Sequence, residues 1–176
     1  ADQHAALEAT PVMRAFAAAA LDEHTARSYL TRQYVLHRAL EQALVPRVPP
    51  AMARLRLQRS AWLADDLREF GFTVDEPEPA VPDVRGWADA LGVLYVLEGS
   101  TLGLRMVRNR LQRDGVTGWP LASRFVQGYG DASGHHWLGL LAELESLPTS
   151  DWPTALAAAQ ATFAAFLTVF AEPADD

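Results

Sequence analysis

Residues Tyr95 to Gly103, with the sequence YVLEGSTLG, lie inside the longest segment with helical periodicity. Each glycine in a helix interior costs about 0.5–1 kcal/mol relative to alanine. Gly99 and Gly103 are one helical turn apart, and Tyr95 lies one turn earlier on the same face. Such a strip of bare backbone lets something approach the helix closely. From spacing alone, the partner could be another helix, a flat ligand, or water and ligand at a bend in the helix.

The rest of the chain also shows helical periodicity, which proline and glycine clusters divide into segments. Strand signals are scarce, because no alternating β-branched run and no Asn-Gly turn occurs. We therefore predict an all-α protein of about seven to eight helices, organised as a single domain over residues 1–176. The predicted helices cover residues 12–21, 25–44, 52–70, 85–113, 123–147 (with a break around 128–134) and 154–170, and residues 75–82 form an exposed loop.

The composition limits the classes of function. The chain has 15 basic and 22 acidic residues and a formal net charge of −7, without a strongly basic run, which disfavours a nucleic-acid or anionic-membrane partner. It has no uninterrupted apolar run of about 18 residues, so we expect no transmembrane helix. Cysteine is absent. Disulfides and thiolate metal sites are thereby excluded, and a cytoplasmic location is favoured.

Two histidines are each followed, four residues later, by a glutamate. In a helix, this spacing lets Glu8 accept the Nδ1 proton of His4 and leaves Nε2 free to bind a metal. An exposed helical ion pair is the simpler explanation of the same spacing. His37 and Glu41 repeat the pattern in the middle of an apolar helix, where a structural role is favoured.

Several enzyme classes are excluded by their motifs. No glutamate is followed three residues later by histidine, as di-iron carboxylate bundles require. The chain also has no H-E-x-x-H, P-loop, G-x-G-x-x-G or G-x-S-x-G sequence. Any chemistry is therefore expected to belong to a bound cofactor.

Several segments together resemble bacterial haem oxygenases, including those paired with bacteriophytochromes. LYVLEGSTLG at residues 94–103 is similar to the distal-helix motif of that family. His4-x-x-x-Glu8, followed by Met13-Arg14-x-Phe16, resembles the proximal-helix segment. The family order continues with Ala39-Leu40-Glu41, with Phe125-x-x-Gly128-Tyr129-Gly130 before Trp137, and with Phe163 and Phe166.

The resemblance implies a haem slot between an N-terminal proximal helix and the glycine-containing distal helix. His4 would be the axial ligand of the haem iron and Glu8 its hydrogen-bond partner, which leaves the opposite iron position open for dioxygen. The distal glycines would let the helix backbone and ordered water approach the porphyrin. The implied catalytic positions are Gly99, Ser100 and Gly103, and the implied cofactor-binding positions are His4, Glu8, Tyr95 and Leu104.

The activity implied by the resemblance is opening of the haem ring to biliverdin, with release of CO and ferrous iron. The reaction uses dioxygen and electrons from a ferredoxin or a flavoprotein reductase. A bacteriophytochrome is a candidate recipient of the biliverdin. The protein is expected to be a cytoplasmic monomer.

Three features depart from the family pattern. A second glycine usually follows Gly103, but this chain has Leu104, which could narrow the distal pocket. The residue after Trp137 is often basic in relatives and is Leu138 here, so a propionate anchor would be missing. Only three residues precede His4, and we expect that residues normally found before it are missing. Two alternatives therefore stay open: a haem-binding or sensory relative without turnover, and a helical interaction module without a cofactor.

Overall fold

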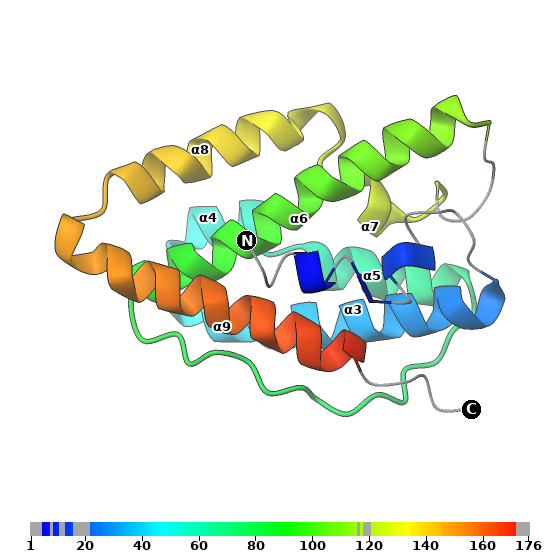
Figure 1. The fold of residues 1–176 in the computed structure, drawn as a ribbon, viewed down its shortest axis with the longest axis horizontal. Helices are drawn as coiled ribbons and strands as arrows, with labels where there is room; N and C mark the ends of the chain where they lie inside the picture. The colour runs from blue at the N-terminus through cyan, green and yellow to red at the C-terminus, as the bar shows by residue number, and fades with distance from the viewer. Residues whose placement is uncertain are drawn as a thin grey trace.

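The structure is a computed structural model that describes residues 5–7, 9–10, 13–15, 22–115, 117 and 121–171. Seven α-helices, α3 to α9, lie within these residues, where no strand occurs. Figure 1 shows α6 in the middle of the molecule, between α8 and α9. The predicted all-α fold class is confirmed.

Helix α3 (Glu23–Leu44) begins two residues before the predicted start because Asp22 caps it. The Asp22 carboxylate accepts a hydrogen bond from the backbone N–H of Thr25 at 2.8 Å, which satisfies one of the unpaired donors at a helix N-terminus. Apolar residues at helical spacing form the buried face of α3, including Leu30, Leu36, Leu40 and Leu44. A short 3₁₀ helix, Val45–Arg47, follows it.

The predicted single helix over residues 52–70 is wrong. The chain instead forms α4 (Pro50–Arg56) and α5 (Arg59–Glu69), separated by Leu57 and Gln58. Neither of these two residues is a glycine or a proline, so the local sequence gave no signal for the break.

A carboxylate from another helix explains where α5 begins. Glu41 of α3 accepts a hydrogen bond from the backbone N–H of Arg59 at 2.7 Å and another from the hydroxyl of Ser60. Backbone N–H groups at a helix N-terminus lack intrahelical partners, and negative charge is favourable there. Glu41 is therefore used as a tertiary cap, and no contact with His37 is among its interactions.

A long irregular segment over residues 72–85 connects α5 to α6 along one side of the molecule (Figure 1). It contains the predicted exposed loop. Four arginines bind this segment. Arg27 donates a hydrogen bond to the hydroxyl of Thr73 at 3.2 Å, and Arg47 donates one to the backbone oxygen of Val84 at 2.9 Å. Arg32 and Arg38 form salt bridges with Glu76 at 3.7 Å and with Glu78 at 3.8 Å.

Helices α6 (Trp87–Arg113) and α9 (Trp152–Ala171) pack against each other. Their closest approach is at Gly92, which is buried. A Cβ atom at this position would overlap the backbone oxygen of Ala155 and would lie 3.0 Å from the Cβ of Ala158. Glycine is thus required here by the contact between the two helices.

The predicted helix over residues 123–147 is interrupted, as expected, near its glycines. Helix α7 (Arg124–Gln127) ends at Gly128, and α8 (Ser133–Glu145) begins after a short 3₁₀ turn. Gly128 and Gly130 have φ angles of 53° and 58°, which side-chain-bearing residues rarely adopt. The left-handed backbone therefore separates α7 from α8.

Two helices among the described residues are long and apolar enough, by length and composition, to cross a membrane: Trp87–Arg113 and Thr149–Ala171. Both segments contain polar residues, so neither is an uninterrupted apolar run. Their contact with each other supplies another cause for the apolar composition, because both contribute residues to the hydrophobic core.

We expect Gly92→Ala to destabilise the protein, although alanine is the better helix former. The gain in helix propensity is about 1 kcal/mol, whereas overpacking against a neighbouring backbone typically costs about 1–3 kcal/mol or more. Urea unfolding followed by circular dichroism measures the difference. The control is Gly103→Ala, because a Cβ at Gly103 meets nothing within 4 Å. Equal stabilisation by both substitutions would contradict the close contact at Gly92.

Candidate active site

A cavity of about 500 Å³ lies beside α6. This volume is within the range of about 300–1,000 Å³ that is typical of small-molecule and cofactor sites. Its wall comes from α3, α6, α7, α8, α9 and the N-terminal residues. The lining residues are Leu7, Met13, Tyr29, Gln33, Tyr95, Val96, Gly99, Ser100, Gly103, Leu104, Val107, Phe125, Trp137, Phe163 and Phe166.

The structure brings together at this cavity all the site residues that were predicted on α6. These residues differ in which side chains of the protein pack against them. A Cβ at Gly103 would meet no atom of the described residues within 4 Å, so these residues leave the backbone bare at that point. A Cβ at Gly99 would lie 3.8 Å from the indole of Trp137. The Ser100 hydroxyl donates a hydrogen bond to the backbone oxygen of Leu97 at 2.7 Å, which leaves its lone pairs available.

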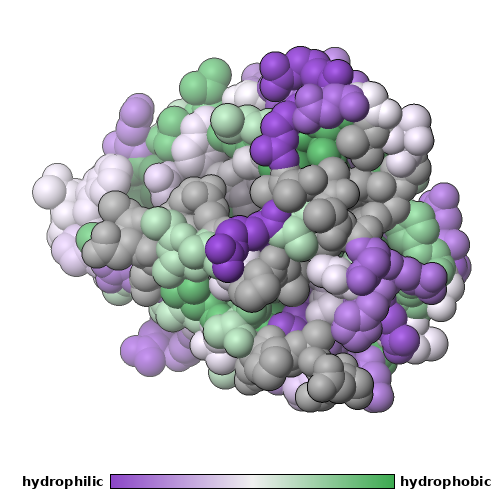
Figure 2. Space-filling view, turned by 45° about the vertical axis from the view of Figure 1, so that its right-hand side comes forward, coloured by the Kyte–Doolittle hydropathy of each residue, from purple (hydrophilic) through white to green (hydrophobic). Residues whose placement is uncertain are grey.

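The two leucines that depart from the family pattern lie in different environments. Leu104 lines the cavity and is only 8% exposed, so its side chain occupies space beside the bare backbone. Leu138 is 66% exposed and is not part of the cavity wall. Exposed apolar residues also occur elsewhere, and Figure 2 shows hydrophobic residues between hydrophilic clusters on one face of the molecule.

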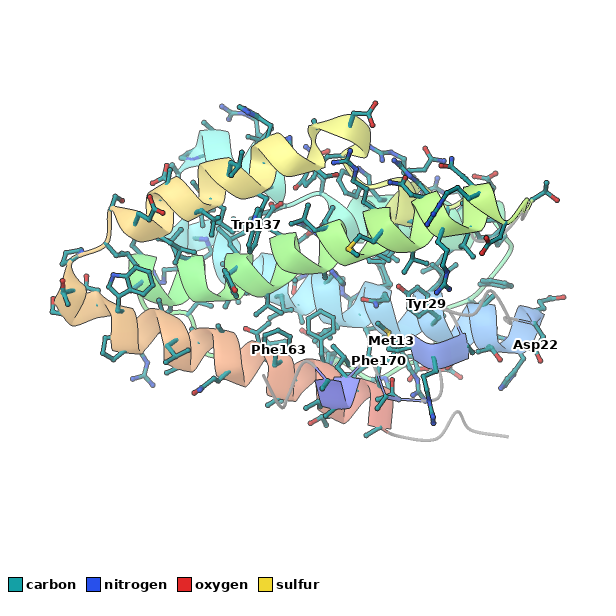
Figure 3. The ribbon with its side chains drawn as sticks, turned by 45° about the horizontal axis from the view of Figure 1, so that its top comes forward. Met13, Asp22, Tyr29, Trp137, Phe163 and Phe170 are labelled. Carbon is teal, nitrogen blue, oxygen red and sulfur yellow. The ribbon has the colours of Figure 1, made fainter. Side chains whose placement is uncertain are left out.

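The predicted axial ligand and its partner, His4 and Glu8, lie outside the described residues. Their neighbours in sequence are described. Leu7 and Met13 both line the cavity, so the N-terminal part of the chain contributes to its wall. Figure 3 shows Met13 and Tyr29 among the side chains around this region.

Two buried polar atoms near the cavity, Gln33 Oε1 and His37 Nε2, have no hydrogen-bond partner among the residues that the structure describes. Gln33 lines the cavity. His37 donates from Nδ1 to the backbone oxygen of Gln33 at 2.9 Å, which leaves Nε2 as an acceptor. The His37 ring packs edge-on against Phe125 and Phe166, with centroids 5.2 and 5.7 Å away. Buried acceptors of this kind are commonly satisfied by ordered water.

Sequence reasoning did not find Tyr29 and Gln33 of α3, and it did not connect His37 with the site. Tyr29, Gln33 and His37 are four residues apart and therefore share one helix face. That face is buried together with apolar neighbours. Polar residues repeated along a buried face are the signal that could have revealed this wall of the cavity.

Behind the glycine strip, α6 is held by a buried ionic cluster. Glu98 accepts from Arg56 at 3.2 Å, from Arg59 at 3.3 Å and from the Tyr129 hydroxyl at 3.3 Å. Arg59 also donates to the Thr101 hydroxyl at 2.9 Å. Burial raises the pKa of Tyr129 to about 12, so its hydroxyl stays protonated and continues to donate. The cluster fixes the residues on either side of Gly99 and Ser100.

The cavity fits haem in shape and polarity. None of the described residues that line it is charged, and six of them are aromatic. Such walls suit a flat apolar macrocycle, and the bare backbone at Gly103 allows close approach. The unpaired acceptors of Gln33 and His37 require hydrogen-bond donors, which ordered water would supply.

The fold and the cavity define a helical protein with an uncharged, largely apolar cavity beside a glycine strip. A family model described as Heme oxygenase matches residues 1–172. The chain therefore belongs to the haem oxygenase family, and the predicted family is confirmed. The family match also supports the predicted enzyme class and the haem ring opening that characterises it.

A solved structure has a similar fold. It is a heme oxygenase from Neisseria meningitidis, whose crystal structures with NO and CO bound have been determined. The TM-score is 0.69 with 23% sequence identity, and the match covers 99% of this chain and 92% of that one. A comparison with curated proteins found no match.

We expect Gly103→Ala to stabilise the ligand-free protein and to weaken binding of hemin. The free energy of unfolding should rise by about 0.5–1 kcal/mol, because alanine is favoured inside a helix and its Cβ meets no neighbour. The same methyl group projects into the cavity. Urea unfolding without ligand and a hemin titration measure the two effects. Tighter hemin binding would contradict the placement of Gly103 against the ligand.

The burial of His37 predicts that the free energy of unfolding decreases in mild acid. Burial, together with the positive charge of Arg59, lowers the pKa of His37 to about 3. Unfolded chains bind a proton at a histidine below about pH 6.5, whereas the folded protein stays neutral there, so stability falls as the pH falls from about 6.5 towards 3. The loss is up to about 1.4 kcal/mol per pH unit.

Replacing this histidine tests the assignment. His37→Leu should flatten the dependence of unfolding free energy on pH between pH 6.5 and 4, relative to the wild-type protein. The control is His24→Leu, at an exposed position at the start of α3, which should leave the slope in place. An unchanged slope in His37→Leu would show that His37 is not the group responsible.

Proposed function

We propose that this chain opens the porphyrin ring of haem to biliverdin, with release of CO and ferrous iron. Dioxygen and external electrons are the co-substrates. The observation that carries the proposal is the uncharged cavity beside α6, where the backbone at Gly103 is bare and the surrounding walls are aromatic. When haem is bound, its iron supplies the centre at which dioxygen is activated.

The residues of the cavity bind and orient the substrate and control its access to water. Trp137 and Phe163, which are labelled in Figure 3, provide apolar contact surface for the macrocycle together with Phe166. Ordered water at Gln33 Oε1 and His37 Nε2 would satisfy both buried acceptors. Such water offers a hydrogen-bond donor inside an otherwise apolar space, where hydrogen bonds are stronger than in bulk water.

We assign the axial ligand to His4 and its hydrogen-bond partner to Glu8. The four-residue spacing of the pair supports the assignment. The adjacent Leu7 supports it as well, because it lines the cavity. A carboxylate at Nδ1 would fix the tautomer of the imidazole and raise its basicity.

We assign the supply of electrons to a separate ferredoxin or flavoprotein reductase, as the resemblance to the family implies. A bacteriophytochrome is the proposed recipient of biliverdin, and the protein is proposed to act as a cytoplasmic monomer with residues 1–176 forming one domain.

Hemin titration tests the assignment of the ligand. Wild-type protein should bind hemin one to one with a Soret shift, and it should convert it to biliverdin when reductant and oxygen are added. His4→Ala should lose the Soret shift, and Glu8→Gln should weaken hemin binding by roughly 10–100-fold. His24→Ala, at an exposed position, is the matched control and should behave as the wild type.

Two outcomes would contradict the proposal. Stable hemin binding without verdohaem or biliverdin formation would exclude turnover. An unaltered Soret shift in His4→Ala would exclude the axial ligand. If hemin produced no Soret shift that depends on His4, a third function would be favoured, in which the glycine strip serves only helix packing and no cofactor is bound.

The position of Leu104 favours one alternative function, a haem-binding relative without turnover. Its buried side chain lies in the cavity wall beside Gly103 and reduces the space for ligand or water. Leu104→Gly discriminates between the two functions. Turnover that appears only in Leu104→Gly supports the alternative, whereas robust turnover by the wild type removes the reason for it.

A further inference from the structure

The two glycines of the α6 strip are not equivalent, because Trp137 covers one of them. The indole atoms Cζ3 and Cη2 lie 3.8 and 4.0 Å from the position that a Cβ of Gly99 would occupy. The indole also contacts the ring of Tyr95, with 5.2 Å between centroids. Figure 3 shows Trp137 between α8 and α6. The space above Gly99 is therefore filled from α8, whereas none of the described residues fills the space above Gly103.

The segment of α8 that carries the indole is fixed relative to the backbone of α6. Arg56 donates to the backbone oxygen of His136 at 3.0 Å, and the same guanidinium group contacts Glu98 at 3.2 Å. The His136 ring also stacks on Tyr129, with centroids 4.0 Å apart. One arginine thus connects the residue before Trp137 with the residue before Gly99.

A flat ligand in the cavity consequently meets different surfaces along α6. At Gly103 it can approach the helix backbone. One turn earlier, towards Tyr95, it meets the indole of Trp137, which is fixed through Arg56 and packed against the helix. Since close-packed interiors yield little, such a side chain limits the position of the ligand along the helix axis.

We infer that Trp137 is a specificity-determining residue, which fixes the position and rotation of haem by blocking its movement along α6 towards Tyr95. The inference rests on the proposed function. The haem ring has four meso carbons, and the one that is attacked depends on how the ring sits in the cavity. Because the four edges of haem carry different substituents, the fixed indole also favours those rotations of the ring whose substituents fit beside it.

The test compares Trp137→Ala and Trp137→Phe with the wild type and with Trp152→Ala. Trp152 is 46% exposed at the start of α9 and is not part of the cavity wall, so it is the matched control. The first measurement is the proton NMR spectrum of the ferric hemin–cyanide complex, which reports the seating of the ring without turnover. The second is the ratio of biliverdin isomers formed.

Trp137→Ala should displace the haem methyl resonances or add a second set, and Trp137→Phe should show a smaller change in the same direction. The biliverdin isomer ratio should change by roughly tenfold in Trp137→Ala, the order that a few methylene groups in an apolar pocket provide. Trp152→Ala should match the wild type in both measurements. If Trp137→Ala does not fold, the spectrum of Trp137→Phe alone decides.

The inference would be overturned if a Trp137 variant bound hemin and showed the same haem methyl resonances and the same isomer ratio as the wild type. The proposed function would then stay intact. Failure of the wild-type protein to bind hemin would overturn both. The two results are distinguishable because the first requires that the wild-type protein binds hemin, whereas the second shows that it does not.

Discussion

The contact of Glu98 with Arg56 and Arg59 is the interaction on which the cavity depends. Burying charges is costly unless they are paired, and here three buried charged groups share one site behind α6. Removing one partner from such a buried cluster typically costs about 3–5 kcal/mol. The cluster holds α6 from behind, so its opposite face can stay uncovered at Gly103 without the helix moving to fill the space.

Three glycines of α6 serve different purposes despite their similar cost to the helix. Gly92 permits the backbone of α9 to approach, as the overlap with Ala155 shows. Gly99 makes room for the indole of Trp137. Gly103 faces open space in the cavity. Three successive glycines of α6 therefore face three different neighbours. These are a helix at Gly92, a side chain at Gly99 and the proposed ligand at Gly103.

Helix α3 contributes polar groups in and beside the cavity that the sequence motif did not indicate, in addition to Tyr95 and Ser100 of α6. Gln33 and His37 present acceptors that protein atoms do not satisfy. In an apolar cavity, such acceptors are costly unless water or a ligand supplies a donor. These acceptors agree with a site that uses ordered water. Because His37 is buried in its neutral form, the same side chain affects both the stability of the fold in acid and the proposed function.

The sequence by itself determined the all-helical class and the strip from Tyr95 to Gly103, because helical periodicity and glycine spacing are local properties, and the resemblance of its ordered motifs indicated the family. The tertiary structure decided what each of these residues faces. It replaced the predicted helix over residues 52–70 by α4 and α5, since the cap from Glu41 comes from a distant segment. It likewise placed Trp137 over Gly99 and left Gly103 bare, because contacts between helices depend on packing in three dimensions.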